Sequence, residues 1–467
     1  MTITRVLVAN RGEIALRVIR ACEELGLGTV LAASEADLDS LPARVADRTV
    51  CIGPARPTDS YLNVPAVIMA ALGTAADAVH PGYGFLAESP ALASACEEAG
   101  LVFVGPTPEQ LRVMGNKIAA RHQAEMSGVP MLPGSERVDD VGEATRLAAR
   151  IGYPIMLKAA AGGGGRGMKI AEDEPALAGV FAAASAEARA AFGDPTLYIE
   201  RYLPDARHVE VQVLGDGTGA VVHVGERDCS LQRRHQKLVE EAPAPALGEI
   251  LQAEIRSAAV ALAAAIDYRS AGTIEFLVSP TERQFSFLEM NTRIQVEHPV
   301  SELVSGVDLV EAQLRLAGGE ALCIAQEDVV LRGHAIECRI NAEVVHEGFR
   351  PNVGTISRWD PPVGPNIRLD THCVAGYQVP VHYDSLLAKL VVYGMTRDEA
   401  IERTCRALDR FFVDGVETTI PFLRFVVGSR AFAEGRVRTR LIDDELLDAY
   451  MAALVGRPSR SSGGAQG

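Results

Sequence analysis

Residues 289–299 read E-M-N-T-R-I-Q-V-E-H-P, and a polar group with catalytic potential stands at each odd position from 289 to 297. Strand side chains alternate with period two, so an extended segment would project all of these groups from one face. An ordinary half-buried strand also alternates polar with apolar residues. The mixture of carboxylate, amide and guanidinium groups favours a functional face over a merely solvated one. The polar set is Glu289, Asn291, Arg293, Gln295 and Glu297, and the apolar set is Met290, Ile294 and Val296.

The segment just before this stretch supplies another carboxylate. Residues 272–276, G-T-I-E-F, predict a strand that carries Glu275, and the turn S-P-T-E-R returns the chain towards Glu289. In such a hairpin the two carboxylates face each other across neighbouring strands, with Asn291 two residues further along. Facing carboxylates are destabilising without a cation, and Mg²⁺ prefers a few hard oxygens together with phosphate oxygens. The sequence therefore predicts a divalent-metal site here, on a strand that gives way to a loop before Glu297.

A glycine-rich loop lies within residues 155–171, which read I-M-L-K-A-A-A-G-G-G-G-R-G-M-K-I-A. The flanking runs predict two strands, and therefore a hairpin whose glycine tip folds over a polyphosphate, because glycine lets backbone N–H groups approach the oxygens closely. The strand after the loop argues against a Rossmann fingerprint, and the position of the lysine argues against a Walker motif. Lys158 would supply a positive charge at the base of the hairpin. A flexible surface turn is the alternative interpretation.

Residues 226–241, E-R-D-C-S-L-Q-R-R-H-Q-K-L-V-E-E, concentrate positive charge in an acidic chain. A solvated charge run is the commonest fate of such a cluster. The functional alternative is an anion pocket for phosphate or a carbonate-like substrate. The cationic residues of the cluster are Arg227, Arg233, Arg234, His235 and Lys237.

The composition is typical of a soluble globular protein. The 467 residues leave room for about three domains, and 48% hydrophobic and 23% charged residues are ordinary values. No run of about 18 apolar residues predicts a membrane span, and the N-terminus lacks the pattern of a signal peptide. The eight cysteines include no C-x-x-C pair, which favours reduced thiols in a cytoplasmic protein. The net charge of −16 argues against general nucleic-acid binding.

The chain divides into successive blocks. Residues 1–115 alternate short apolar runs with helical stretches, which predicts a doubly wound parallel sheet. The turn after the first run, N-R-G-E-I-A, lacks the dinucleotide fingerprint. The later blocks are residues 131–203 with the glycine loop, 204–330 and 331–447, followed by a flexible tail over 456–467. Strands are predicted at residues 5–9, 29–33, 78–80, 101–104, 155–158, 168–171, 209–214, 273–278 and 284–290.

Long motifs occur in the order seen in biotin carboxylases, which this chain resembles from residue 1 to about 445. They are N-R-G-E-I-A, H-P-G-Y-G-F-L-A-E, M-G-N-K, K-A-A-A-G-G-G-G-R-G-M, E-R-D-C-S-L-Q-R-R-H-Q-K-L-V-E-E-A-P-A-P, E-M-N-T-R-I-Q-V-E-H-P-V, G-H-A-I-E-C-R-I-N-A-E and Y-D-S-L-L-A-K. The resemblance implies an α/β and α+β protein with the ATP-grasp fold. Its parts would be an N-terminal Rossmann-like domain (1–115), a mobile glycine-loop lid (131–203), a central ATP-grasp domain (204–330) and a C-terminal biotin carboxylase domain (331–447).

The resemblance also implies a role for each candidate residue. The residues expected to bind ATP are Lys117, Lys158, Gly164, Gly165, Glu200, Arg201, Tyr202, Leu203, His208 and His235, with Glu275, Glu289 and Asn291 as ligands of Mg²⁺ or Mn²⁺. The residues expected around bicarbonate are Lys237, Arg293, Gln295, Val296 and Arg339, with Glu297 as the base and Arg339 also at biotin. Arg293 would in addition stabilise the biotin ureido oxygen.

The implied reaction is ATP-dependent carboxylation of biotin N1 on a carrier protein, through carboxyphosphate. We expect a homodimeric, stand-alone subunit that works with a biotin carboxyl carrier protein and carboxyltransferase subunits, as in acetyl-CoA carboxylase of fatty acid synthesis. Another ATP-grasp carboxylate ligase and a non-catalytic subunit of a carboxylase complex are the alternatives. The chain departs from the family pattern at Ala159–Ala161, Val344–Val345 and Asn352, which puts lid contacts and the surroundings of Arg339 in question.

Overall fold

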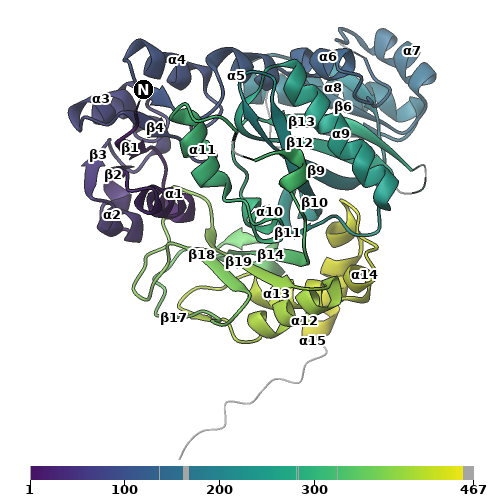
Figure 1. The fold of residues 1–467 in the computed structure, drawn as a ribbon. Helices are drawn as coiled ribbons and strands as arrows, with labels where there is room; N and C mark the ends of the chain where they lie inside the picture. Colours follow the sequence, from purple (N-terminus) through teal and green to yellow (C-terminus); the bar gives the residue numbers. More distant parts are fainter. Residues whose placement is uncertain are drawn as a thin grey trace, which may run out of the picture.

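The computed structural model describes residues 2–135, 137–160, 168–279, 281, 283–322 and 324–455. The predictions for the glycine tip, with Gly164 and Gly165, and for the tail over 456–467 lie outside the described residues. Figure 1 shows the course of the chain, from the N-terminal block in purple through teal to the C-terminal helices in yellow.

The N-terminal block is built on a five-stranded parallel sheet. Its strand order, β3-β2-β1-β4-β5, matches the first five strands of the Rossmann order 3-2-1-4-5-6, which confirms the doubly wound prediction. The four strands predicted here coincide with β1, β2, β4 and β5. The elements are β1 (Arg5–Val8), α1 (Gly12–Glu24), β2 (Gly28–Ala33), η1 (Glu35–Asp37), α2 (Leu41–Val45), β3 (Arg48–Cys51), η2 (Pro57–Asp59), α3 (Val64–Gly73), β4 (Ala78–His80), α4 (Pro90–Glu98), β5 (Val102–Phe103) and α5 (Pro108–Gly115).

A small antiparallel sheet of order β7-β6-β8 carries the two arms of the glycine loop. Lys158 on β6 lies opposite Met168 on β7, so the arms pair as the predicted hairpin requires. Helices α7 and α8 pack on this sheet through a cluster of small and aliphatic side chains. The elements are α6 (Lys117–Met126), α7 (Val141–Ile151), β6 (Ile155–Ala159), β7 (Met168–Ala171), α8 (Glu174–Phe192) and β8 (Leu197–Arg201).

An eight-stranded antiparallel sheet forms the largest layer, with the order β13-β12-β9-β10-β11-β14-β19-β18. Because β11 pairs with β14, one sheet continues across residue 330, from the strands beside α9 to those beside α12 (Figure 1). The central elements are β9 (Arg207–Asp216), β10 (Val221–Arg233), β11 (Gln236–Ala242), α9 (Glu249–Ala265), β12 (Arg269–Ser279), β13 (Gln284–Asn291), α10 (His298–Ser305) and α11 (Leu309–Ala317).

The C-terminal block completes this sheet and covers it with helices. Its core gathers residues of β14 and β19 with residues of α12 and α13. The elements are η3 (Gln326–Asp328), β14 (His334–Asn341), β15 (Glu343–Val344), η4 (Val345–Glu347), β16 (Arg350–Pro351), β17 (Arg358–Asp360), β18 (Ile367–Thr371), β19 (Leu386–Gly394), α12 (Arg397–Leu408), β20 (Phe412–Asp414), α13 (Ile420–Val427), α14 (Arg430–Ala433), η5 (Ile442–Leu446) and α15 (Leu447–Val455).

Helix α10 is the element that positions the candidate site on the large sheet. Its apolar side chains Val300 and Val304 pack against Ala242, Ala335 and Val391, which come from β11, β14 and β19. The first turn of α10 and the residue before it are thereby held over the middle of the sheet.

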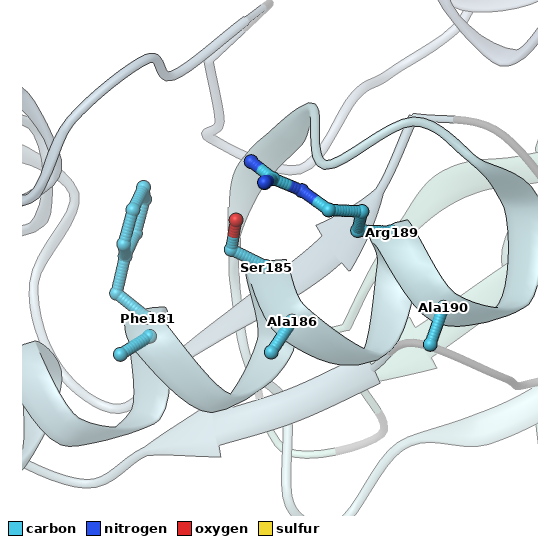
Figure 2. Close-up of a pocket in the computed structure, with 6 residues that line it drawn as sticks. Phe181, Ser185, Ala186, Arg189 and Ala190 are labelled. Carbon is cyan, nitrogen blue, oxygen red and sulfur yellow. The ribbon is translucent and has the colours of Figure 1, made fainter.

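Helix α8 carries a hollow of about 550 Å³ on its surface. Figure 2 shows Phe181, Ser185 and Arg189 projecting from this helix around it. None of the predicted site residues lines the hollow, whose lining comes from one helix, so the candidate site lies elsewhere. Across the described part of the chain no helix combines the length and the apolar character needed to cross a membrane.

Candidate active site

The hairpin of β12 and β13 brings the predicted metal-type oxygens together. Glu275 lies directly opposite Glu289, and Asn291 lies opposite Thr273. The Asn291 amide donates from Nδ2 to Oε1 of Glu275 over 2.8 Å. A register shift between Phe276 and Glu275 places Glu275 opposite Glu289 rather than Leu288.

The strand ends at Asn291, which confirms the loop predicted before Glu297, whereas the expectation of one continuous strand face is wrong for Arg293 and Gln295. The chain leaves the sheet because α10 begins at His298, and Pro299 in its first turn is pre-set for a helix and lacks the N–H that a strand ladder needs.

Side-chain hydrogen bonds keep the polar groups together after the strand has ended. The Arg293 guanidinium donates from Nη2 to Oδ1 of Asn291 over 3.0 Å and from Nη1 to Oε1 of Gln295 over 2.8 Å. Its Nε donates to Oε2 of Glu88 over 3.1 Å. The Gln295 amide in turn donates to Oε1 of Glu275 over 3.1 Å. Sequence reasoning quoted the motif that contains Glu88 but assigned that residue no role.

Lys237 contacts three carboxylates at the centre of the site. Its ammonium donates to Oε2 of Glu210 over 2.6 Å, to Oε1 of Glu275 over 3.0 Å and to Oε1 of Glu297 over 2.6 Å. Burial alone would lower the pKa of Lys237, but the three carboxylates, Glu210 foremost, raise it well above its ordinary value. Sequence reasoning missed Glu210. The period-two spacing of His208 and Glu210 on a predicted strand was the signal that would have found it.

Glu297 is the N-cap residue of α10 and is fully buried. Its Oε1 accepts from Lys237, and its Oε2 accepts from Nη2 of Arg339 over 2.8 Å. Burial alone would raise the pKa of Glu297, but Lys237 and then Arg339 hold it well below its ordinary value. The N-terminus of a helix also favours a negative charge. Glu297 is therefore ionised in this arrangement, between two cations that were both predicted as bicarbonate contacts.

His208 contacts the other oxygen of Glu275. Its Nε2 lies 2.9 Å from Oε2 of Glu275. Burial alone would lower the pKa of His208, but the Glu275 carboxylate raises it. Burial alone would likewise raise the pKa of Glu275, but Lys237 and then His208 lower it. Glu275 is therefore an anion with a cationic or polar partner at each oxygen.

The donor set at the hairpin fits a hard divalent cation. The Glu289 residue is exposed to solvent. Partial desolvation and then the facing carboxylate of Glu275 raise the pKa of Glu289, and a cation would relieve the repulsion between the two carboxylates. Glu289, Glu275 and Asn291 supply only oxygen and amide groups, as Mg²⁺ prefers.

Two other groups of ligand-type atoms are close enough for a metal but already surround a cation. They are His208 with Glu210 and Glu275, and Glu210 with Cys229 and Glu297, and within each group the ligand atoms lie within 4.8 Å of one another. The ammonium of Lys237 contacts Glu210, Glu275 and Glu297. Since this ammonium supplies the balancing charge, neither group requires an ion.

The predicted phosphate lysines lie on the lid side of the hairpin. Lys158 on β6 pairs with Oε2 of Glu200, and Arg121 pairs with the other oxygen of the same carboxylate. Lys117 begins α6 within electrostatic reach of Glu289 and Lys158. Burial lowers the pKa of Lys117, and Lys158 adds to this effect against the opposing charge of Glu289. The structure thus places Lys117 within electrostatic reach of both the Glu289 carboxylate and Lys158.

The predicted adenine segment, Glu200–Leu203, connects the lid strand β8 to β9. Its backbone is held from two sides, because Arg201 N donates to the Pro133 carbonyl over 2.9 Å and Tyr202 N donates to the Pro154 carbonyl over 3.0 Å. The Tyr202 hydroxyl accepts from Nη1 of Arg440 over 3.3 Å. Leu203 is half-buried beside them.

The basic cluster is not a solvated charge run. Arg227 is fully buried and donates from Nε to Oε1 of Glu210 over 2.6 Å.

Arg234 and His235 form the two-residue tip between β10 and β11, with φ angles of 47° and 65°. The left-handed region costs about 1–2 kcal/mol for each non-glycine residue, and such strain is typical of functional sites. Burial, then Lys158 and His208, lowers the pKa of His235, which places its ring near the lid lysine.

The main-chain carbonyl of Val296 accepts from Nζ of Lys389 over 3.0 Å. Lys389 is the last residue of the motif Y-D-S-L-L-A-K, which carried the resemblance, but it was given no role there. Direct contacts connect several of the predicted site residues and add Glu88 and Glu210 to them, while Lys389 holds the backbone at Val296. The predicted residues in contact are His208, Lys237, Glu275, Asn291, Arg293, Gln295, Glu297 and Arg339.

Three family models match successive parts of the chain. They describe the biotin carboxylase N-terminal domain at residues 2–111, the ATP-binding domain of the carbamoyl-phosphate synthase L chain at residues 116–325, and the biotin carboxylase C-terminal domain at residues 337–444. Together they leave only short stretches of the region between residues 2 and 444 unmatched.

Whole-chain relatives agree with these models. The chain is 49% identical to biotin carboxylase 1 of Bacillus subtilis (strain 168) over 442 residues, which is 94% of this chain and 98% of that protein. It superimposes on the crystal structure of a biotin carboxylase–beta-gamma-ATP complex from Campylobacter jejuni with a TM-score of 0.92 and 46% identity, covering 94% of this chain and 98% of that one.

A second solved structure extends the likeness to another carboxylase. It is the biotin carboxylase domain dimer of Hydrogenobacter thermophilus 2-oxoglutarate carboxylase, in complex with MgADP, ADP and bicarbonate. The TM-score is 0.91 at 44% identity, covering 96% of this chain and 99% of that one. The ATP-grasp fold expected from the motifs is thereby confirmed, and the chain belongs to the biotin carboxylase family of ATP-dependent ligases.

Proposed function

We propose that this protein carboxylates N1 of biotin on a carrier protein, with ATP and bicarbonate as co-substrates and carboxyphosphate as the intermediate. The observation that carries the proposal is the buried carboxylate of Glu297, held between Lys237 and Arg339. A base flanked by two permanent cations suits a reaction that must bind a small anion and remove its proton.

The nucleotide would lie between the lid and the hairpin of β12 and β13. In this proposal the lid is residues 131–203, the central domain 204–330, the N-terminal domain 1–115 and the C-terminal domain 331–447. Lys117 and Lys158 would bind the phosphates, and Glu275, Glu289 and Asn291 would hold Mg²⁺ or Mn²⁺, which neutralises phosphate charge. The remaining proposed nucleotide contacts are Gly164, Gly165, Glu200, Arg201, Tyr202, Leu203, His208 and His235.

Bicarbonate would bind beside Glu297, between Lys237 and Arg339. As the substrate anion takes up hydrogen bonds from these two cations, Glu297 loses part of the stabilisation of its charge, and its pKa rises towards that of a useful base. Bicarbonate oxygen then attacks the γ-phosphorus, the bond to ADP breaks, and carboxyphosphate forms. Preorganised cations around the transferring group supply the electrostatic part of catalysis. Gln295 and the backbone at Val296 complete the proposed pocket.

Arg293 would act on the second half of the reaction. Carboxyphosphate breaks down to CO₂ and inorganic phosphate, the phosphate takes the proton from biotin N1, and the carbon of CO₂ then forms a bond with that nitrogen. The negative charge that develops on the ureido oxygen needs a donor that does not titrate, and a guanidinium meets this need. The contacts of Arg293 with Asn291, Gln295 and Glu88 hold it in a fixed orientation.

The test is an ATPase assay with bicarbonate and free biotin supplied separately. The proposal expects ATP hydrolysis that requires bicarbonate, rises with biotin, and forms carboxybiotin. Dependence on another carboxylic acid would instead identify a different ATP-grasp ligase. Absence of turnover in protein that still binds nucleotide would favour a non-catalytic subunit.

We also propose the macromolecular partners. A biotin carboxyl carrier protein would deliver biotin, and carboxyltransferase subunits would pass the carboxyl group to acetyl-CoA in fatty acid synthesis. The chain is similar over nearly its full length to both a biotin carboxylase and a domain of 2-oxoglutarate carboxylase, so the acceptor needs its own test. Affinity capture with this chain as bait, followed by identification of biotinylated proteins, tests the carrier, and sedimentation analysis tests the proposed homodimer.

A further inference from the structure

Two buried carboxyl groups lie next to the proposed catalytic residues without belonging to them. Glu240 on β11 and Glu337 on β14 are directly opposite each other in the antiparallel pairing of these strands. Both residues are 0% exposed. Opposed residues on neighbouring strands have Cβ atoms about 4.5–5.5 Å apart, so the two carboxyl groups share one small buried volume.

The hydrogen bonding of this pair is incomplete. Among the residues that the structure describes, neither oxygen of Glu337 has a hydrogen-bond partner, and Oε2 of Glu240 has none. The remaining oxygen, Oε1 of Glu240, accepts from Nε of Arg339 over 2.6 Å. A buried carboxylate without donors is strongly unfavourable, and two facing carboxylates add their mutual repulsion. A carboxyl group that keeps its proton avoids both penalties.

Arg339 connects the pair to the proposed base. Its Nη2 contacts Oε1 of Glu240 at 2.5 Å and Oε2 of Glu297 at 2.8 Å. Burial raises the pKa of Glu240 to about 7, although the charge of Arg339 acts in the opposite direction. Burial raises the pKa of Glu337 well above its ordinary value, although the charge of Lys389 opposes this shift. The charged and titratable groups that face the pair are Arg339 on β14, Lys389 on β19, Lys237 on β11, Glu297 at the start of α10, and the thiols of Cys229 and Cys338.

We propose that Glu240 and Glu337 share one proton at neutral pH, and that this pair positions Arg339 between Glu240 and Glu297. With one proton the pair carries a single negative charge, which leaves part of the Arg339 guanidinium for Glu297 and for bicarbonate. Loss of the proton would double the charge and draw Arg339 towards the pair. Glu337 is thus a positioning residue that acts through Arg339.

The structural part of the proposal does not depend on the proposed function, and thermal unfolding tests it. The carboxyl pKa is higher in the folded state than in the unfolded state, where it is about 4.3. The wild type therefore loses stability as the pH rises from the unfolded-state pKa through the folded-state pKa. Glutamine at 337 does not titrate. The melting temperature of Glu337→Gln minus that of the wild type should therefore rise between pH 5.5 and 8.5, by roughly 3 °C or more. A constant difference would overturn the shared proton.

The control is Asp77→Asn, which removes a carboxylate whose pKa is shifted in the opposite direction. Oδ2 of Asp77 accepts from the Thr4 hydroxyl and from the backbone N–H groups of Thr4 and Arg5, and these hydrogen bonds lower its pKa. Asp77 therefore titrates below the tested window, so the melting temperature of Asp77→Asn minus that of the wild type should stay constant from pH 5.5 to 8.5. If Glu337→Gln does not fold, Glu240→Gln tests the same pair. The melting temperature of Glu240→Gln minus that of the wild type must then also rise with pH.

The catalytic part rests on the proposed function and is tested by the pH profile of kcat/KM for bicarbonate. In Glu337→Gln the alkaline fall of this profile should move upward by about one pH unit, with the KM for ATP unchanged. An unaltered profile would overturn the positioning role. If the wild-type protein shows no bicarbonate-dependent turnover, the proposed function is contradicted. The melting experiment would still test whether Glu240 and Glu337 share a proton.

Discussion

The ammonium of Lys389 donates to the main-chain carbonyl of Val296 over 3.0 Å, one residue before Glu297. Lys389 is 0% exposed, and its Nζ also lies 3.0 Å from Oε2 of Glu13 and 3.6 Å from Oε2 of Asp370. One buried cation on β19 therefore joins helix α1 of the N-terminal block, strand β18 and the loop that leads into α10. The position of the proposed base depends on all three parts of the molecule.

Replacement of Lys389 by methionine should destabilise the protein strongly. Removing one partner of a buried ion pair leaves uncompensated charge and costs about 3–5 kcal/mol. The control is Lys169→Met, because Lys169 forms a partly exposed pair with Glu187 on the lid at 2.9 Å, and such pairs contribute about 0–1 kcal/mol. Thermal unfolding compares the two variants. A melting temperature of Lys389→Met no lower than that of the control would contradict this role of the buried cation.

Arg293→Ala should reduce biotin carboxylation far more than nucleotide binding. Loss of one preorganised donor to a developing oxyanion costs about 10²–10³ in kcat. The predicted nucleotide contacts lie on other elements, so the Kd for ADP should remain close to that of the wild type. Steady-state turnover and calorimetric nucleotide titration measure the two effects. Equal losses in both would assign Arg293 to structure or to the nucleotide site instead.

The sequence predicted the elements that depend on local patterns. Apolar runs located β1, β2, β12 and β13, because a buried strand needs a continuous or alternating apolar face. The predicted hairpin does place Glu275 opposite Glu289, but through a register shift beside Phe276 that no sequence pattern indicated. The strand period failed after Asn291, where side-chain contacts over long sequence distances decide the path of the chain. The Arg293–Glu88 pair spans 205 residues, and no local pattern contains that information.

The charge partners of the site were the least predictable part. Lys237 meets Glu210, Glu275 and Glu297, which come from β9, β12 and the start of α10. Glu275 and Glu297 lie in segments that the sequence singled out, but a motif does not reveal which carboxylate faces which ammonium across an eight-stranded sheet. The order β9-β10-β11 brings Glu210 and Lys237 into reach, and that order is a property of the folded chain.

Glu289→Gln should remove the response to metal without harming the metal-free protein. In the absence of a cation the substitution relieves the repulsion between Glu289 and Glu275, so the melting temperature should stay equal or rise slightly. Added MgADP should then stabilise the variant less than the wild type, because a weaker complex shifts unfolding less. Glu109→Gln, in an exposed pair with Arg112, is the control and should respond to MgADP as the wild type does. Unchanged turnover of Glu289→Gln with metal present would show that the ligand assignment is wrong.

Glu241 should be a source of acid sensitivity in the fold. Its Oε2 accepts from Nε of Arg397 and lies against Nε2 of His334, each at 2.7 Å, and its Oε1 accepts from Nη2 of Arg397 over 3.0 Å. Burial alone would raise the pKa of Glu241, but His334 and Arg397 lower it. A carboxyl group whose pKa is lower in the folded state stabilises the fold at any pH above its unfolded-state pKa of about 4.3. This stability is lost as the pH falls through the folded-state pKa.

Glu241→Gln should therefore be less stable than the wild type by about 3–5 kcal/mol at pH 7, with the difference narrowing as the pH falls below about 4. Melting temperatures measured from pH 3 to pH 7 follow this convergence. Glu434→Gln is the control, because the Glu434 carboxylate is also paired with arginines but lies at the surface, where salt screens the interaction. A gap between Glu241→Gln and the wild type that persists at pH 3 would mean that packing, rather than the ionised carboxylate, joins β11 to α12.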